Sequence, residues 1–272
     1  TNPGWHFNHG SPNFNICNRS NNQLLKKYIQ ELLETEIIKS DNSDFIELNG
    51  SPSNYKIKSS DFYSGKNYIP RSSMSELSME IISMYDFNNQ IDYYFKTLIV
   101  KLCYENNKWV LISKNGIRFK ARFLVCSSNL ILHKRSLEIL KIKQIPLRNA
   151  IPIYKNKRID KIIKLLNNQD YIQRLTFLIY TKPYYCYKDN YKNKYRYFLL
   201  NKILEDKFKF ERIIFQKQLN NKLGLVIHTR NSEFINEYFQ SKNKDKFNKN
   251  IINNFNLIFD ENPFINKIID YK

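Results

Sequence analysis

The chain has 272 residues, of which 42% are hydrophobic, a composition that suits a globular protein and excludes an intrinsically disordered one. Its 44 Lys and Arg against 25 Asp and Glu give a formal net charge of +19, which alone would point to a polyanionic partner. Lysine outnumbers arginine by 33 to 11, however, whereas proteins that read nucleic acids favour Arg for bidentate contacts. We therefore attribute the charge to the drift in composition that an A+T-rich genome imposes, and expect no nucleic-acid partner.

The sequence also indicates in which cellular compartment the protein is expected. No apolar run approaches the roughly 18 residues that span a bilayer, and no segment resembles a signal peptide, so we expect no membrane partner. The four cysteines are widely spaced and form no C-x-x-C pair, which is typical of a reducing cytoplasm and argues against a zinc site. The sequence does not indicate an oligomeric state.

In the N-terminal half, the spacing of apolar residues predicts a helix over residues 21–36, capped by Asn21 or Asn22. Residues 42–66 are polar and rich in Ser and Asn, with apolar–polar alternation over residues 45–48 and a turn expected at Asn49-Gly50. Ser72 or Ser73 can cap a second helix whose apolar face includes Leu77. A three-stranded meander is predicted over 92–126, with turns at Asn106-Asn107 and Asn115-Gly116, followed by a helix over 130–142.

In the C-terminal half, predicted strands alternate with polar connecting segments. Strand-like runs are predicted at 175–180, 208–216 and 223–229, separated by polar connections rich in Lys and Asn. A long helical pattern fills residues 232–259. The fold class expected is therefore mixed α+β or α/β, with many strands of antiparallel type.

A motif that the chain lacks narrows its chemistry. A dinucleotide fold needs G-x-G-x-x-G between its first strand and helix, so that backbone N–H groups can approach the pyrophosphate. The six glycines of this sequence form no such motif, and none forms a P-loop. The chain as it stands cannot bind a nucleotide in either of those ways.

Three segments nevertheless resemble the renalase-like branch of FAD-dependent, amine-oxidase-type flavoproteins. Phe7 to Phe14 (FNHGSPNF) is similar to the family's F-D-H-G-A-Q-Y-F, and Tyr68 to Leu77 (YIPRSSMSEL) to its Y-V-G-x-x-G-M-x-x-L. The run from Ile99 to Ser127 is similar to a family stretch with a strand, a W-x-L strand and a final V-V-L-A strand. A weaker similarity lies at 226–234. Pro70 and Ser73 stand where the family has glycine, and Asn8 and Arg122 where it has aspartate.

This resemblance implies an internal piece of a longer flavoprotein, whose first βαβ unit precedes Thr1 and whose last FAD-contacting strand follows Lys272. Residues 1–20 and 67–145 would form a partial FAD-binding domain that includes the meander. Residues 21–66 and 146–272 would form an antiparallel-sheet substrate domain with helices. The intact protein would oxidise a small amine-like or dihydronicotinamide-like donor by hydride transfer to the flavin, and the chain alone would be inactive.

The resemblance also implies which residues would contact FAD: His9, Gly10, Ser11, Ser73, Met74, Ile99 and Ser127. Gly10 would let the backbone approach the planar ring system, where a Cβ would clash, although His9-Gly10 can equally be an ordinary turn. Ile99 would meet the adenine, or be a plain core residue of its strand. Ser127 would lie near the cofactor, or cap a helix after its strand. No residue has a defensible catalytic role.

Two histidines outside these segments have alternative interpretations. His228 ends an apolar strand, where it could line a substrate pocket. His133 is flanked by Lys134 and Arg135, and we expect it to be solvated. The alternative function is a non-enzymatic basic module that binds an acidic partner or single-stranded nucleic acid, with the aromatic stretch Tyr180 to Tyr187 stacking on bases.

Overall fold

The computed structural model describes residues 7–8, 11–17, 20–51, 54–59, 65–85, 90–169, 172–180, 185–187, 195–218, 223–261 and 269–271. The chain forms two compact units. The first comprises Thr1–Asn89 and Ile172–Lys272, and the second Gln90–Tyr171. These units differ from the division expected from the sequence, because strands at 14–17, 38–40 and 65–70 pair with one another. The assignment of cofactor-binding and substrate roles to parts of the chain stays a prediction.

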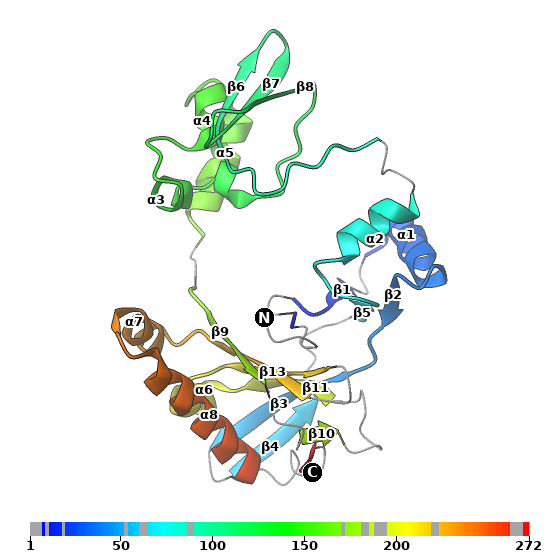
Figure 1. Ribbon diagram of the computed structural model, residues 1–272, viewed down its shortest axis with the longest axis vertical. Helices are drawn as coiled ribbons and strands as arrows, with labels where there is room; N and C mark the ends of the chain where they lie inside the picture. The colour runs from blue at the N-terminus through cyan, green and yellow to red at the C-terminus, as the bar shows by residue number, and fades with distance from the viewer. Residues whose placement is uncertain are drawn as a thin grey trace. The chain divides into compact units, whose positions relative to one another are not determined.

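A mixed six-stranded sheet forms the centre of the first unit (Figure 1). Its strands, in the order in which they lie, are β4 (Asn54–Ser59), β3 (Asp44–Ser51), β11 (Tyr195–Leu200), β12 (Arg212–Lys217), β13 (Leu223–Thr229) and β9 (Leu175–Tyr180). Neighbouring strands are antiparallel except β11 and β3, which are parallel. The fold is therefore mixed α and β with mainly antiparallel pairing, as expected.

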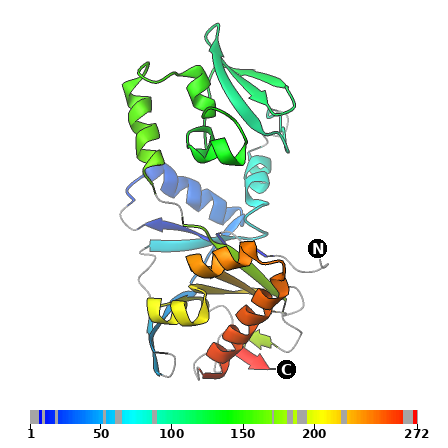
Figure 2. The ribbon, with the colours of Figure 1, turned by 90° about the vertical axis from the view of Figure 1, so that its left-hand side faces the viewer.

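Three helices cover one face of this sheet: α6 (Lys202–Phe208), α7 (Ser232–Gln240) and α8 (Lys244–Glu261). Figure 2 shows α7 and α8, in orange to red, in front of the strands. Alternate strand residues such as Phe198, Ile213 and Phe215 point into this layer and are fully buried beside Phe255 and Ile258. Phe198 and Phe215 meet edge to face with ring centroids 5.1 Å apart, a geometry that adds to their hydrophobic stabilisation.

A second layer of the first unit combines the sheet β1-β5-β2 with two helices. The strands are β1 (Phe14–Cys17), β5 (Gly65–Pro70) and β2 (Ile38–Ser40), and the helices are α1 (Gln23–Glu34) and α2 (Leu77–Met84). The α1 prediction is confirmed, and the Asn22 side chain caps it by accepting from the Leu25 N–H at 3.1 Å. Ile29, Leu32, Ile38 and Tyr68 form the core of this layer.

The second unit contains the predicted meander, β6 (Ile99–Glu105), β7 (Lys108–Ser113) and β8 (Arg118–Ala121). Asn106 and Asn107 both have positive φ, as a tight hairpin turn requires. The helices η2 (Asn129–Ile131), α3 (Arg135–Ile139), α4 (Pro146–Ala150) and α5 (Lys157–Asn167) accompany it. Leu102, Leu147 and Ile163 form the core.

Several sequence predictions were wrong in detail. Asn49 and Gly50 lie inside β3, because the hairpin closes two residues later at the Ser51–Asn54 pair. The predicted strand over 208–216 begins only at Arg212, since α6 continues to Phe208 and ends at Lys209, which has a φ of 65°. The pattern over 232–259 divides into α7 and α8 at Ser241, whose hydroxyl accepts from the Asn243 N–H.

Two further predictions changed. The helix expected over 130–142 is a 3-10 turn followed by the short α3. His133 is buried rather than solvated: it lies between the 3-10 turn and α3, and its Nδ1 accepts from the Arg135 N–H at 3.0 Å. Strand β10 (Tyr185–Tyr187) pairs with β14 (Ile269–Tyr271). Among the helices of the described residues, none combines the length and apolar character that crossing a bilayer requires.

Candidate functional site

The face of the six-stranded sheet opposite α6, α7 and α8 carries the candidate site, and we call it the cavity face. Cross-strand pairing arranges its side chains in rows. One row is apolar and joins Phe45, Tyr197, Ile214, Val226 and Leu178. The next row towards one end of the strands is polar, with Arg212, His228 and Thr176 side by side. Period-two alternation therefore gives each strand one apolar face for the helices and one face of mixed chemistry.

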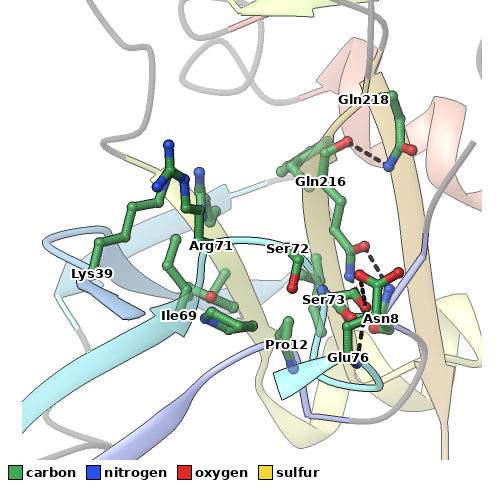
Figure 3. A pocket seen from close by; sticks show the side chains of 15 residues that line it. Asn8, Pro12, Lys39, Ile69, Arg71, Ser72, Ser73, Glu76, Gln216 and Gln218 are labelled. Atoms are coloured by element: carbon green, nitrogen blue, oxygen red, sulfur yellow. Dashed lines mark hydrogen bonds between the residues drawn. The ribbon is translucent and has the colours of Figure 1, made fainter. Parts of the chain in front are cut away.

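A cavity of about 750 Å³ opens on this face, and we call it the first cavity (Figure 3). Strands β11 and β12 form its floor with Tyr197, Ile214 and Gln216. Strand β5 and the turn after it supply a wall. Its charged lining residues are Lys39, Arg71, Arg196 and Glu76. The first cavity is thus lined by three cationic side chains and one carboxylate.

Asn8 connects the walls of the first cavity. Its backbone N–H donates to Gln216 Oε1 at 3.0 Å, and its carbonyl accepts from Gln216 Nε2 at 3.0 Å. Its side-chain Oδ1 accepts from the Met74 N–H at 3.2 Å. Beside it, the Phe7 ring lies against Gly224, where an added Cβ would come within 2.4 Å of that ring. Phe7 and Asn8 are therefore held against β12, β13 and the turn that precedes α2.

Tyr197 lies in the floor of both cavities of this face and forms a buried pair with Asp41. Its hydroxyl donates to Asp41 Oδ2 at 2.9 Å, and the Ser43 N–H donates to Asp41 Oδ1 at 3.1 Å. Burial raises the pKa of the Tyr197 hydroxyl, and the negative charge and hydrogen bond of Asp41 raise it further. The hydroxyl therefore stays protonated at pH values at which an exposed tyrosine would ionise.

Replacing Tyr197 by phenylalanine should lower the free energy of unfolding at pH 7 by about 1–3 kcal/mol, because buried Asp41 loses one donor. A raised folded-state pKa means that the tyrosine's contribution is complete below its unfolded pKa near 10 and is lost as the pH rises above it. The difference between wild type and variant should therefore shrink by up to about 1.4 kcal/mol per pH unit above pH 10. Urea denaturation at pH 7 and pH 11 measures it, and a difference independent of pH would contradict the assignment.

A second cavity, of about 380 Å³, lies on the same face and shares Pro12, Tyr197 and Ile214 with the first. Its lining includes Ser11, Asn13 and the polar row Arg212, His228 and Thr176. His228 Nδ1 and the Thr176 hydroxyl are 3.1 Å apart, within hydrogen-bonding distance. His228 therefore lines a cavity; that this cavity receives a substrate stays a prediction.

The other predicted site residues are divided between the two units. His9 and Gly10 lie outside the described residues. Ser73 lines the first cavity, and its hydroxyl bonds to the side chains of Ser75 and Glu76 within its own turn. Ile99 packs against the core of the second unit, and Ser127 is exposed in the same unit. Ser11 thus lines the second cavity, Ser73 lines the first, and the Met74 N–H donates to Asn8 beside the first, whereas Ile99 and Ser127 belong to the other unit.

Several residues of the site were not among the site residues expected from the sequence: Asn8, Asn13, Asp41, Tyr197, Arg212 and Gln216. One signal could have found two of them. Arg212 and Gln216 are polar residues four positions apart, on either side of the apolar run 213–215, so they share a face of the strand. Asp41 and Tyr197 are 156 residues apart, and no local pattern connects them.

Comparisons with known proteins give distant likenesses only. No family model matches the sequence, and no curated protein is similar to it. A putrescine oxidase double mutant with redesigned cofactor binding has a TM-score of 0.39 at 7% identity over 68% of this chain and 35% of that one. Tetracycline destructase Tet(55) has a TM-score of 0.38 at 12% identity, over 91% and 54%. A flavoprotein/dehydrogenase from Cytophaga hutchinsonii has 0.42 at 9% identity, over 91% and 52%.

The chain spans between about a third and about half of the length of these structures. All three TM-scores are below 0.5, so these likenesses do not assign the chain to a family. The grounds for a function are therefore the residues of the chain itself and the resemblance of its sequence segments.

Proposed function

We propose that the chain is part of a flavin-linked oxidoreductase and that the first cavity receives the flavin ring. One observation carries the proposal. The segments 7–14 and 68–77, which separately resemble the renalase-like flavoproteins, meet through the Asn8–Met74 hydrogen bond at the wall of the first cavity. These segments are about 60 residues apart in the sequence, so their meeting at one cavity is not a consequence of chain proximity.

The residues present fit the ring portion of such a cofactor. The volume of about 750 Å³ falls within the range of small-molecule sites. Arg71 is paired with Glu36, but Lys39 and Arg196 still outnumber the carboxylate of Glu76 in the lining, which favours a ring that gains negative charge on reduction. A bound flavin would supply hydride acceptance from an amine-like or dihydronicotinamide-like donor. The chain's own contribution is positional: the Asn8–Gln216 pair holds the wall, while Tyr197 and Ile214 form an apolar floor.

The sequence contains no glycine-rich pyrophosphate turn. The proposal therefore expects this chain to recognise the ring and to gain little from the pyrophosphate or adenine of FAD. Riboflavin and FAD should bind with dissociation constants within about threefold of each other, because both present the same ring. A threefold ratio corresponds to a binding free-energy difference of about half of that for a tenfold ratio.

Titration of flavin fluorescence against the purified chain tests this. Gln216→Leu removes the two hydrogen bonds between Asn8 and Gln216, and we expect it to weaken riboflavin binding at least about tenfold. Gln240→Leu, an exposed position at the end of α7, is the matched control and should leave binding unchanged. Absence of saturable riboflavin binding by the folded chain, or equal binding by both variants, would overturn the proposal.

A further inference from the structure

The second cavity combines groups that complement an anion. Across its floor, Arg212, His228 and Thr176 lie side by side on three neighbouring strands. Arg174 also lines the cavity, where its Nε is paired with Glu211 Oε1 at 2.9 Å, and no Asp or Glu is among the lining residues that the structure describes. The Arg212 guanidinium, with an imidazole and a hydroxyl beside it and no carboxylate in the lining, favours a negatively charged ligand.

An unsatisfied amide gives independent evidence that the second cavity binds a ligand. Asn13 lines the cavity and is only 5% exposed, yet its Nδ2 has no hydrogen-bond partner among the described residues. A buried donor without a partner costs free energy, so native structures seldom retain one unless something else satisfies it. A ligand oxygen in the second cavity would accept from this amide.

The apolar lining and the volume of the second cavity indicate what kind of molecule carries the negative charge. Phe45 and Tyr197 stack with ring centroids 4.3 Å apart and planes inclined by 8°, and Ile214 continues this apolar wall. The volume of about 380 Å³ lies near the lower limit for small-molecule sites. A bare phosphate would leave the apolar wall uncovered, whereas a small acid with a flat or branched apolar body would cover it.

We infer that the second cavity is a subsite for the carboxylate of a small organic acid, bound by Arg212 and Asn13. The adjoining first cavity shares Tyr197 and Ile214 with it, so the remainder of such an acid can extend towards the proposed flavin site. The role of the acid as the molecule to be oxidised rests on the proposed function. The binding of its carboxylate does not.

Calorimetric titration of the purified chain with benzoate, in the absence of flavin, tests the inference. Benzoate should bind saturably, benzamide at least about tenfold more weakly, and inorganic phosphate should not displace benzoate. Arg212→Met should weaken benzoate binding at least about tenfold, whereas Arg158→Met, which removes the same charge from an exposed position in the other unit, should not.

Asn13→Asp preserves the shape of the side chain and adds a negative charge, so it should abolish benzoate binding while the circular dichroism spectrum stays native. The Asn13→Asp variant therefore tests the inference even if Arg212→Met fails to fold. Equal affinity for benzoate and benzamide, displacement by phosphate, or unchanged binding by Asn13→Asp would overturn the inference. The benzoate titration contains no flavin, so its outcome is independent of the riboflavin titration. A chain that binds riboflavin but not benzoate would contradict the carboxylate subsite alone. A chain that binds benzoate but not riboflavin would contradict the flavin proposal alone.

Discussion

Replacing Gly65 by alanine should lower the free energy of unfolding by more than about 3 kcal/mol and separate β1 from β5. Gly65 has a φ of +135°, a conformation that residues with a Cβ rarely adopt. A Cβ built there would lie 2.1 Å from the backbone carbonyl oxygen of Ile16, on the strand with which β5 pairs. Because that neighbour is backbone, it cannot rotate away as a side chain would, and the ladder itself must open.

Gly116→Ala is the matched control. Gly116 also has a positive φ, of 84°, but an added Cβ would meet no atom within 4 Å. The free energy of unfolding of this variant should therefore fall only by the cost of placing alanine in the left-handed conformation, about 1–2 kcal/mol. Chemical denaturation of both variants measures the difference. Similar losses in the two variants would show that the β1–β5 ladder is not as close as the structure has it.

Replacing Arg230 by methionine should cost about 2–4 kcal/mol, the second-largest effect that we expect. Its guanidinium contacts Glu205 Oε2 at 3.1 Å and Glu211 Oε2 at 3.1 Å. The two carboxylates are almost fully buried, with side chains 1% and 8% exposed. Among the ion pairs of the described residues, removal of the arginine leaves Glu205 with a 3.8 Å contact to Lys202 and leaves Glu211 with Arg174. A buried carboxylate deprived of its cation is destabilising, and the partial exposure of Arg230 moderates the loss.

Lys202→Met provides the comparison for this network. Lys202 is 68% exposed and contacts Asp206 at 2.9 Å, so its loss should cost less than about 1 kcal/mol. Thermal and urea denaturation of the two variants in parallel distinguish a buried ion network from a surface pair. If Lys202→Met proves as harmful as Arg230→Met, the burial of Glu205 and Glu211 is not what makes the network important.

Local patterns predicted the elements that local chemistry specifies. The helix beginning after Asn22 and the meander with its Asn106-Asn107 turn arise from side-chain capping and from residues that tolerate positive φ. The hairpin formed by β3 and β4 was predicted only in part. The alternation over residues 45–48 indicated the apolar part of β3, whereas β4 is mostly polar and becomes a strand through its pairing with β3. Tertiary context overrides propensity in such segments.

The candidate site was predictable only in part for the same reason. Ser73 and Met74 could be singled out from a sequence segment, and His228 from the end of an apolar strand. The groups that hold the site together are long-range pairs, as in the hydrogen bonds of Asn8 with Gln216, 208 residues apart. Hydrogen bonds of this separation depend on the order of strands in the sheet, which the sequence alone did not specify.

Hydrogen–deuterium exchange of the chain with and without riboflavin tests the central claim, that the first cavity receives a flavin ring. Bound riboflavin should slow exchange in residues 71–76 and 214–216, which contain lining residues of the cavity, and at Asn8. Exchange in α7 and α8, on the opposite face of the sheet, should not change. Unchanged exchange around the first cavity at saturating riboflavin, or protection confined to residues 90–171, would contradict the claim.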